Sequence, residues 1–285
     1  MPCPLCDDTG WKPVDGDSAR RVVRCDCWRE GITARLLNDA LIPPRYRRCT
    51  LDALITYPNE KFLKAMDVAQ RFASSFPVCD KGLLLVGPPG IGKTHIAIAV
   101  LTQVIRNTGA RGLYYDTRTL LTLIRSTYDP VIRTAPTDYL RPCMEADLLV
   151  LDDLGAERLT DWVEETMNLI VNTRYNNKKL TIFTTNYEDT PDDASGEPHD
   201  FSLKERIGFR VHSRLREMCT FLEYEGPDFR DLPPNVGSED LFGLWKAQPR
   251  RKLPHRSKGP VRAQLKQAQG KARDLGWSGG KAGHN

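Results

Sequence analysis

The sequence contains no long hydrophobic run and no recognisable secretory signal. Its longest apolar stretches, near 82–86 and 148–151, are far too short to span a bilayer. The first four residues are not a basic segment followed by an apolar run, so we expect a cytoplasmic protein without a membrane partner. A hydrophobic share of 40% and a charged share of 27% exclude wholesale disorder and fibrous repeats. The 285 residues are enough to bury an ordinary core.

Acidic residues are almost missing from the end of the chain. Residues 241–285 hold eleven Lys and Arg against one acidic residue, a net charge of +10, which leaves −6 on the rest because the total is +4. Beyond Trp245 no apolar periodicity persists, so we expect residues 246–285 to be disordered. A basic tail on a mildly acidic body is typical of a chain that approaches a polyanion. Contact with DNA phosphates is the interpretation we favour, and solubility alone is the alternative.

The cysteines are unevenly distributed. Four of the eight fall within the first 27 residues, as CPLC and CDC separated by eighteen residues. A reducing cytosol would keep a disulfide framework open, whereas four thiolates satisfy a tetrahedral zinc ion. A segment this short has almost no core, so the metal would stabilise it. The pattern predicts a zinc site, with free or redox cysteines as the alternative; its ligands are Cys3, Cys6, Cys25 and Cys27.

From residue 81 onward, apolar strands alternate with amphipathic helices. The predicted strands are near-continuous apolar runs, as expected of parallel strands buried on both faces: 82–86, 112–116, 148–152 and 180–186. Helices are expected at 28–41 and 59–76 and around 96–104 and 163–171. The pattern predicts an α/β fold with a parallel sheet and helices on both faces. The predicted parts are a zinc-binding segment (1–28), a linker with helices that introduce the core (29–80), the core (81–245) and the tail (246–285).

A glycine-rich loop follows the first of these strands. GPPGIGKT, residues 87–94, matches the phosphate-binding pattern GxxxxGKT and stands where that pattern requires, between a strand and a helix. Its glycines let backbone amides form an anion nest, and the helix dipole adds partial positive charge. We expect Lys93 to reach the β- and γ-phosphates of ATP and Thr94 to ligate magnesium. The candidate nucleotide-binding residues of this loop are Gly87, Pro88, Pro89, Gly90, Ile91, Gly92, Lys93, Thr94 and His95.

Two later strands end in polar residues suited to phosphoryl transfer. LLVLDDLG, residues 148–155, ends a strand in two carboxylates. We expect Asp152 to hold magnesium and Asp153 to polarise the attacking water as general base. Asn186, at the end of the 180–186 strand, is a candidate γ-phosphate sensor, although such a residue is also common in turns.

An arginine-rich helix is predicted over 202–218, SLKERIGFRVHSRLREM. It begins with a capping box, Ser202 and Glu205, and places one apolar stripe on a single face: Leu203, Ile207, Val211 and Leu215. Arg206, Arg210 and Arg214 lie on a neighbouring stripe. For Arg206 and Arg210 the interpretation we favour is that they only keep the helix surface hydrated. Because ATP hydrolysis gains most from a guanidinium supplied by a neighbouring subunit, one of the three is also a candidate trans-acting finger.

Several motifs together resemble one family. In chain order GPPGIGKTHIAIAV, ADLLVLDDLG, TIFTTN, RIGFRVHSRL and GPDFR resemble the AAA+ core of replicative helicase loaders of the DnaC and DnaI type, and of the related IstB transposition helpers. IPPRYRRCTLDAL resembles the segment that introduces this core. The similarity covers residues 40–232. It implies a P-loop NTPase of the AAA+ (ASCE) type that assembles as a homo-oligomer, with nucleotide between subunits.

The resemblance also implies roles for particular residues. Arg214, in HSRL, takes the arginine-finger position, and Arg230, in PDFR, is the second sensor that contacts bound nucleotide. A helical element around 117–128 helps to grip single-stranded DNA. Loaders of the DnaI type carry an N-terminal zinc-binding domain that engages the helicase, but the cysteine segment here is much shorter and lacks a histidine ligand.

The predicted function is ATP-dependent loading or remodelling of a replicative helicase on single-stranded DNA. The expected cofactors are ATP, Mg²⁺ and Zn²⁺. One alternative is an IstB-like transposition helper that binds duplex DNA as a filament. Another is a zinc-containing DNA-binding adaptor with little ATP turnover. The intact set of Lys93, Thr94, Asp152 and Asp153 argues against the last of these.

Overall fold

The computed structural model describes residues 3–7, 9, 11–13, 22–56, 58–129, 131, 133–189, 202–230 and 243. These residues all belong to one compact unit, Met1–Leu253, while a second unit, Pro254–Asn285, falls outside them. The predicted basic tail therefore lies outside the described residues. None of the described helices combines the length and the apolar surface that crossing a bilayer requires.

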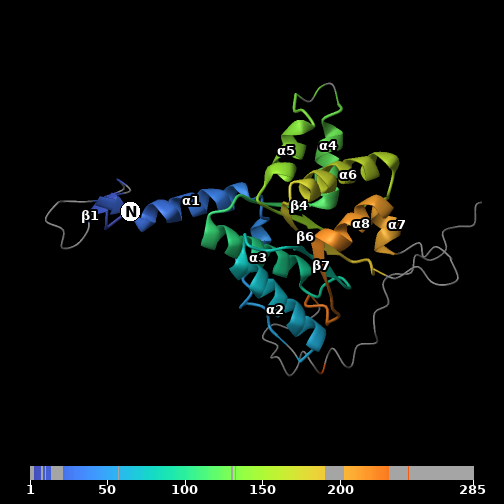
Figure 1. Ribbon diagram of the computed structural model, residues 1–285, viewed down its shortest axis with the longest axis horizontal. Coiled ribbons are helices and arrows are strands. Elements are labelled where there is room, and N and C mark those ends of the chain that lie inside the picture. The colour runs from blue at the N-terminus through green and yellow to red at the C-terminus, as the bar shows by residue number, and fades with distance from the viewer. Residues whose placement is uncertain are drawn as a thin grey trace, which may run out of the picture. The chain divides into compact units, whose positions relative to one another are not determined.

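A five-stranded parallel sheet forms the centre of the fold (Figure 1). Its strands stand in the order β4–β5–β6–β3–β7. They comprise β3 (Gly82–Val86), β4 (Gly112–Asp116), β5 (Leu148–Asp152), β6 (Leu180–Thr185) and β7 (Cys219–Glu223). Four strands confirm the predicted ranges to within one residue. β7 was not predicted, because CTFLE follows a helix without a turn signal and exposes Thr220 and Glu223 at the sheet edge.

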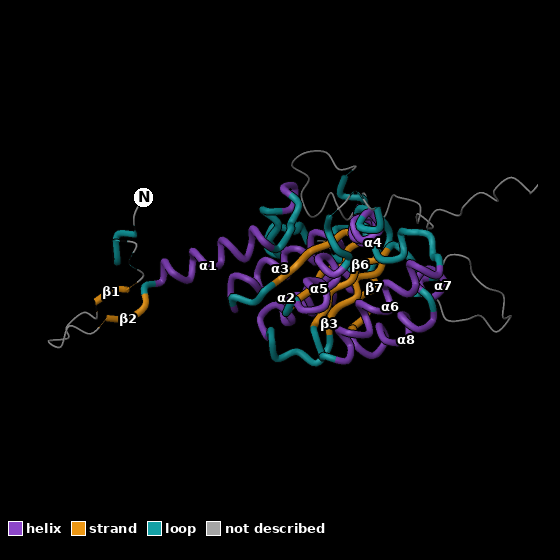
Figure 2. Tube along the Cα trace, turned by 90° about the horizontal axis from the view of Figure 1, so that it is seen from above, coloured by secondary structure: helices purple, strands orange, loops and turns teal. Residues whose placement is uncertain are grey.

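Helices cover both faces of this sheet, as predicted (Figures 1 and 2). On β3, Leu83 and Leu85 pack into one buried cluster and Leu84 and Val86 into the other. The first cluster is closed by α2 (Glu60–Ser75) and α3 (Lys93–Thr108). The second is closed by α4 (Thr117–Ser126), α5 (Thr137–Glu145), α6 (Asp161–Asn176), α7 (Leu203–Ile207) and α8 (Phe209–Met218). The parallel α/β architecture is confirmed.

The segment before the core is helical and then irregular. α1 (Asp26–Asp39) begins and ends two residues earlier than expected, and a 3₁₀ turn, η1 (Pro44–Tyr46), follows it. Leu36 and Leu37 near the end of α1 pack on the core. Directly after the helix, the carbonyl of Ala40 accepts a hydrogen bond of 2.9 Å from the Tyr114 amide of the edge strand β4. This segment is thereby attached to the edge of the sheet.

The arginine-rich segment forms two helices, so the prediction of one continuous helix is wrong. Gly208 separates α7 from α8 with φ +83°, a conformation that favours glycine, and the carboxylate of Glu164 packs against its Cα. The cap is confirmed, since the Ser202 side chain accepts from the Glu205 amide at 3.3 Å. The predicted apolar stripe is buried throughout: Leu203, Ile207, Val211 and Leu215. The break turns the chain without interrupting the stripe.

Arg174 of α6 is buried at 1% exposure. Its guanidinium donates to the carbonyls of Cys143 (2.8 Å), Ala146 (2.9 Å) and Leu180 (2.5 Å), and to the Thr181 hydroxyl (2.8 Å). These acceptors lie at the end of α5 and the start of β6. The arginine therefore satisfies orphan carbonyls of a helix end inside the core, and burial lowers its pKa to about 10.

Candidate functional site

The glycine-rich loop connects β3 to α3 in a conformation that its sequence dictates. Gly87, Gly90 and Gly92 have φ angles of +152°, +87° and +91°. A Cβ at Gly87 would lie 2.2 Å from the Tyr224 carbonyl oxygen, and one at Gly90 would lie 1.9 Å from an Asp228 carboxylate oxygen. The Tyr224 backbone therefore excludes a side chain at Gly87, and the positive φ at Gly90 favours glycine there. Ile91 is fully buried and anchors the loop to the core.

Lys93, the first residue of α3, is buried beneath the loop. Its Nζ donates to the carbonyls of Gly87 (2.8 Å) and Pro88 (2.7 Å) and to Oδ1 of Asn186 (2.7 Å). Burial lowers the pKa of this ammonium to about 8, although the nearby carboxylates of Asp153 and Asp152 oppose the shift. An anion at the loop would raise this pKa again.

Asp152 ends β5 and gathers three hydroxyl groups. Its carboxylate accepts from Thr94 (2.9 and 3.0 Å), Tyr114 (2.8 Å) and Thr184 (2.6 Å). Burial, and then the charge of Asp152, raises the pKa of Tyr114, so this phenol stays a donor. Tyr114 and Thr184 were not singled out in the sequence, because they lie inside strands that read as core. Only the alignment of parallel strand ends brings them to the carboxylate.

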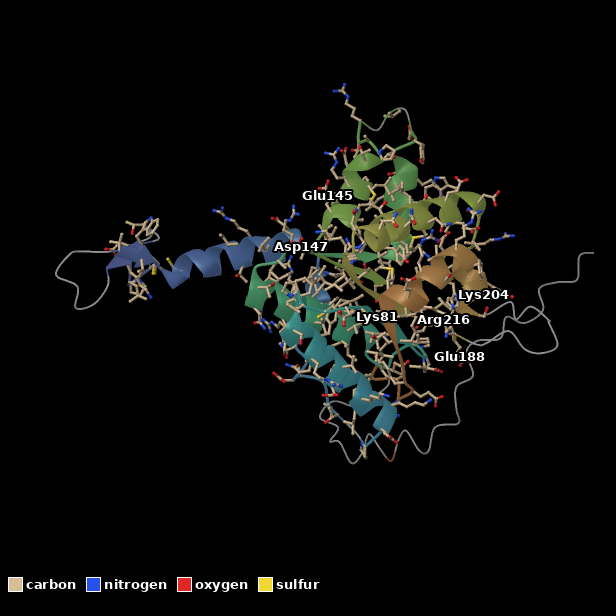
Figure 3. All side chains as sticks on the ribbon, viewed as in Figure 1. Lys81, Glu145, Asp147, Glu188, Lys204 and Arg216 are labelled. Carbon is tan, nitrogen blue, oxygen red and sulfur yellow. The ribbon has the colours of Figure 1, made fainter. Side chains whose placement is uncertain are left out.

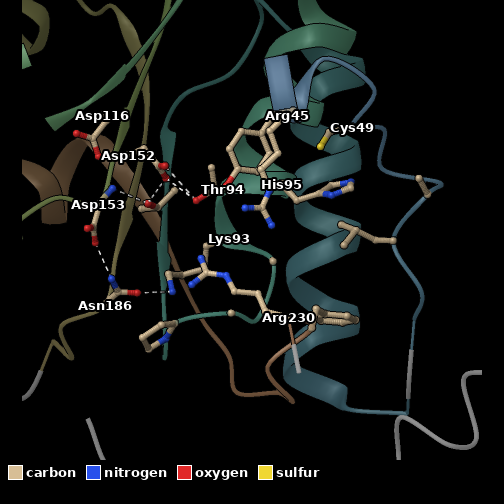
Figure 4. Close-up of a pocket in the computed structure, with 18 of the residues that line it drawn as sticks. Arg45, Cys49, Lys93, Thr94, His95, Asp116, Asp152, Asp153, Asn186 and Arg230 are labelled. Carbon is tan, nitrogen blue, oxygen red and sulfur yellow. Dashed lines mark hydrogen bonds between the residues drawn. The ribbon is translucent and has the colours of Figure 1, made fainter. Parts of the chain in front are cut away.

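Asp153 adopts a left-handed backbone conformation, with φ +55°, which is uncommon outside glycine. Its amide donates to the Thr184 hydroxyl (2.9 Å), and its Oδ1 accepts from Nδ2 of Asn186 (2.6 Å) (Figure 4). Burial, and then the charge of Asp152, raises the pKa of this carboxyl. The turn thus directs two adjacent carboxylates to different partners.

The strand order explains why Asn186 meets both Lys93 and Asp153. In the sheet, β6 lies between β3, which precedes the loop, and β5, which ends in the acids. Because all the strands are parallel, their carboxyl ends meet at one edge. Asn186, one residue beyond β6, therefore bridges the lysine on one side and the acid on the other.

A pocket of about 570 Å³ opens over these groups. It is lined by predicted residues from the loop and the strand ends: Pro89, Gly90, Gly92, Lys93, Thr94, His95, Asp152, Asp153, Asn186 and Arg230. Arg230 projects into it, and its charge also acts to lower the pKa of Lys93 (Figure 4). His95 also lines the pocket, and its Nε2 lies at hydrogen-bonding distance, 2.9 Å, from the Thr50 carbonyl oxygen.

One wall of this pocket was missed in the sequence. It comes from the segment before the core, with Phe229 added, and consists of Arg45, Tyr46, Cys49, Leu54, Ile55 and Phe229. The IPPRYRRCTLDAL resemblance was the available signal, but it assigned no role to these side chains. The pocket therefore has a polar end at the loop and an end with apolar side chains.

The donor set fits a magnesium-bound nucleoside triphosphate. Loop amides and the Lys93 ammonium suit phosphate oxygens, and the Thr94 hydroxyl and Asp152 carboxylate are the hard oxygen ligands that magnesium prefers. The apolar side chains at the other end suit a base. The geometry therefore brings together most of the predicted site residues.

Arg214 lies apart from this pocket. It lines a separate hollow of about 290 Å³ between α6 and α8, with its Nε donating to Oδ1 of Asn172 (3.0 Å) and its Nη1 to the Arg210 carbonyl (2.9 Å). A residue that acts on a neighbouring subunit must lie outside its own site, and Arg214 meets this condition. Arg206 does not solvate the helix, contrary to expectation: its guanidinium donates to the carbonyls of Gly155, Ala156 and Glu157.

The four N-terminal cysteines converge as predicted. A two-stranded antiparallel hairpin, β1 (Trp11–Pro13) and β2 (Val22–Arg24), leads from the first pair to the second. The four sulfurs all lie within 4.8 Å of one another, with Cys3 and Cys25 at 3.8 Å and Cys6 and Cys27 at 3.2 Å. Tetrahedral zinc with Zn–S bonds of about 2.3 Å separates its sulfurs by about 3.8 Å, so the cluster fits this ion. Cys27 lies in the first turn of α1 rather than on the expected returning strand.

Comparisons with known proteins decide the family. The model of the IstB-like ATP binding protein family matches residues 36–190, more than half of the chain. The chain belongs to this family. The match begins in α1 and includes both the glycine-rich loop and the double acid.

Individual relatives agree with this membership. The uncharacterized protein YqaM of Bacillus subtilis is 25% identical over 70% of this chain and 63% of its own length, and the replicative helicase loader DnaC of Buchnera aphidicola is 25% identical over 64% and 69%. Among solved structures, a crystal structure of the DnaC helicase loader is 36% identical, with a TM-score of 0.54, and the match covers 64% of this chain and 99% of that one. The predicted P-loop AAA+ fold and the resemblance to the DnaC, DnaI and IstB group are confirmed.

Proposed function

We propose that this protein is an ATP-hydrolysing switch of the helicase-loader type. The single observation that supports this most directly is the bridge formed by Asn186, which holds Lys93 at 2.7 Å and Asp153 at 2.6 Å. A site that merely binds nucleotide needs the lysine and the loop. Turnover also needs an acid near the γ-phosphate, and Asn186 connects such an acid to the phosphate-binding lysine.

The hydrolysis step can be derived from these side chains. Lys93 and the loop amides would hold the β- and γ-phosphates of ATP, and Thr94 and Asp152 would hold a magnesium ion, which would supply positive charge to the phosphate oxygens. Asp153 takes a proton from water as its oxygen attacks the γ-phosphorus, and ADP leaves with the bridging oxygen. Asn186 orients the acid and the γ-phosphate. Arg230 contacts the phosphates from the opposite wall, and the base lies among Tyr46, Leu54, Ile55 and Phe229.

Arg214 completes the site of a neighbouring copy. Its position outside its own pocket and beside a hollow on the α6–α8 surface supports a homo-oligomer with nucleotide between subunits. A guanidinium supplied in trans is worth roughly 10³–10⁵ in rate. We propose Arg214 as this finger.

The macromolecular partners follow from the relatives. Proteins named replicative helicase loaders occur among both the sequence relatives and the similar structures. We propose that the chain acts on a replicative helicase and on single-stranded DNA, with α4 near the DNA strand, and that it works in the cytoplasm.

The four-cysteine cluster would form a zinc-stabilised module ahead of the ATPase core. Cys3, Cys6, Cys25 and Cys27 would hold the ion as thiolates, and the positive end of α1 would favour the charge on Cys25 and Cys27. We keep the division into 1–28, 29–80, 81–245 and 246–285 as a proposal, with the basic tail as a DNA tether.

A second candidate function has one specific observation in its favour. The family model that matches this chain is that of the IstB-like ATP binding proteins. A transposition helper of this type would act on duplex DNA. An adaptor that binds ATP with little turnover is a third candidate, and the bridge through Asn186 argues against it.

Steady-state ATP hydrolysis separates these functions. We would measure it without DNA, with single-stranded DNA and with duplex DNA, each at two salt concentrations. Stimulation mainly by single strands supports the loader function, and stimulation by duplex supports the transposition helper. Lys93→Ala and Arg214→Ala serve as matched variants: the first should lose nucleotide binding, while the second should keep affinity and lose turnover. Equal turnover in Arg214→Ala would rule out the finger assignment.

A further inference from the structure

The helix pair α7–α8, whose second helix carries Arg214, is attached through α7 to both loops that follow Asp153 and Asn186. Arg206 of α7 donates to the carbonyls of Gly155 (2.8 Å), Ala156 (3.3 Å) and Glu157 (3.0 Å), just beyond Asp153. The Leu203 amide of α7 donates to the Glu188 carbonyl at 2.9 Å, beyond Asn186. The two-helix unit is therefore in direct contact with the strand ends of its own nucleotide site.

Asp189, three residues after Asn186, makes the strongest of these connections. Its Oδ1 lies 2.5 Å from Nε2 of His212, and its Oδ2 accepts from Nη1 of Arg216 at 2.8 Å. Both partners belong to α8. The side chains of Asp189 and His212 are 15% and 10% exposed, so their contact is largely shielded from water. A shielded contact of this kind fixes geometry better than an ion pair in solvent.

The position of this contact on α8 determines what it can do. His212 and Arg216 each stand two residues from Arg214, and two residues of an α-helix turn through about 200°. Arg214 therefore points to the opposite side, toward α6, where Asn172 accepts from its Nε. Asp189 on one side and Asn172 on the other together fix the rotation of α8 about its axis. Arg216 and Glu188, the residue directly before Asp189, are both labelled in Figure 3.

We propose that Asp189 is a positioning residue for Arg214: by pairing with His212 and Arg216 it joins the finger helix to the loop that follows Asn186. The inference rests on the proposed function, because it assumes that Arg214 acts in the neighbouring subunit. One subunit's own nucleotide site and the finger that it presents to the next subunit are then linked through a stretch of only three residues.

Mixed oligomers test this in a way that a structural role would not mimic. Asp153→Asn subunits have an inactive site but an intact finger, and Arg214→Ala subunits have an intact site but no finger. Each variant alone should be nearly inactive, whereas a mixture should recover turnover at Arg214→Ala sites that face an Asp153→Asn neighbour. Asp189→Asn is then introduced either into the Asp153→Asn subunit, which donates the finger, or into the Arg214→Ala subunit, whose site accepts it. Glu188→Gln, the adjacent exposed carboxylate, is the matched control in both positions.

We expect Asp189→Asn to lower the recovered rate by about ten- to a hundredfold in the donor, the loss typical of a misplaced catalytic group, and by much less in the acceptor. The KM for ATP should stay the same, since the acceptor's pocket is untouched. An equal loss in both positions would mean a general structural role and would overturn the proposal, as would no loss in the donor. If the mixture recovers no turnover even without Asp189→Asn, the trans-acting finger itself is wrong, and the positioning role fails with it.

Thermal unfolding of each variant accompanies the kinetics. The positioning role of Asp189 is supported if the Asp189→Asn donor loses complementation but has the same melting temperature as the Glu188→Gln donor. If Asp189→Asn fails to fold, Arg216→Gln serves instead, because its side chain is 64% exposed and it removes only one of the two contacts. The donor–acceptor asymmetry is expected there too, with a smaller loss.

Discussion

The nucleotide pocket and the four-cysteine cluster are both groups of side chains that converge on a ligand, yet they are built in opposite ways. The pocket's polar groups are attached to the ends of strands whose residues are almost fully buried. The two cysteine pairs flank a two-stranded hairpin, and apolar side chains of this segment face solvent, with Leu5, Trp11 and Val22 exposed by 60%, 49% and 56%. One site is held by the core beneath it, whereas the other is joined by a short hairpin and its four sulfurs.

This difference decides what each site needs in order to exist. The sheet positions Asp152 and Asn186 because Leu151 and Phe183 of the same strands pack into one core, and buried Ile91 anchors the loop that leads to Lys93. The hairpin has no such cluster among its described residues, so a bound ion must supply the cohesion. Removal of nucleotide should therefore leave the pocket intact, whereas removal of zinc should unfold the segment that carries the cysteines.

The largest effect is expected at the cysteines. Cys25→Ser, or chelation of the wild-type protein, should abolish zinc binding worth roughly 10 kcal/mol and separate strands β1 and β2 without lowering the stability of the core. Elemental analysis and limited proteolysis of the N-terminal segment measure this. Cys79→Ser, at a single half-buried cysteine outside the cluster, should keep the metal. A wild-type zinc content near zero would contradict the zinc site.

A core substitution should have the reverse pattern. Arg174→Met leaves the buried carbonyls of Cys143 and Ala146 without this donor, so we expect a loss of about 3–5 kcal/mol in the free energy of unfolding. Urea denaturation provides the measurement. Arg71→Met removes an exposed i,i+4 pair with Asp67 and should cost less than about 0.5 kcal/mol. Comparable losses in the two variants would mean that the buried hydrogen bonds of Arg174 contribute little to stability. Zinc content should be unchanged in both variants.

Substitutions at two glycines with similar backbone angles compare the pocket with an exposed helix end. Gly90→Ala and Gly109→Ala both force a side chain into positive φ, at +87° and +69°, which costs roughly 1–2 kcal/mol. Only at Gly90 does the new methyl collide with Asp228; at Gly109 it meets open space. We therefore expect nucleotide affinity to fall about tenfold or more in Gly90→Ala and to stay unchanged in Gly109→Ala. Titration with a fluorescent ATP analogue reports the difference, and equal affinities would contradict it.

The smallest effect is a pH dependence of ATP affinity. Burial holds the pKa of Lys93 at about 8 in the nucleotide-free protein, and phosphate charge must raise it, so binding above this pH takes up a proton. Affinity should fall as pH rises through 8, by up to about tenfold per unit. Calorimetry in buffers of different ionisation enthalpy detects the proton. In Lys93→Arg the guanidinium stays charged, so the dependence should disappear; its persistence would assign the proton to another group.

The sequence predicted the parts of the fold that a local pattern encodes. Buried parallel strands read as continuous apolar runs, and the glycine-rich loop, the double acid and the two cysteine pairs are visible as short motifs. What the sequence did not reveal depends on distant residues. Gly208 breaks a helix whose apolar stripe continues across it, Arg206 turns toward carbonyls fifty residues earlier, and Tyr114 reaches Asp152 only because two parallel strands align. β7 was missed for a related reason, since its partner β3 is far away in the chain.

The hydrogen bond from the Tyr114 amide to the Ala40 carbonyl has a consequence for solubility. β4 is an edge strand, and an open edge offers its unpaired backbone groups as a template on which strands of other molecules can assemble. The segment after α1 occupies one of those groups and lays Ala40 and Ile42, both buried, across the flank. The stretch that leads into the α/β core thus also protects this edge of the sheet against pairing with strands of other molecules.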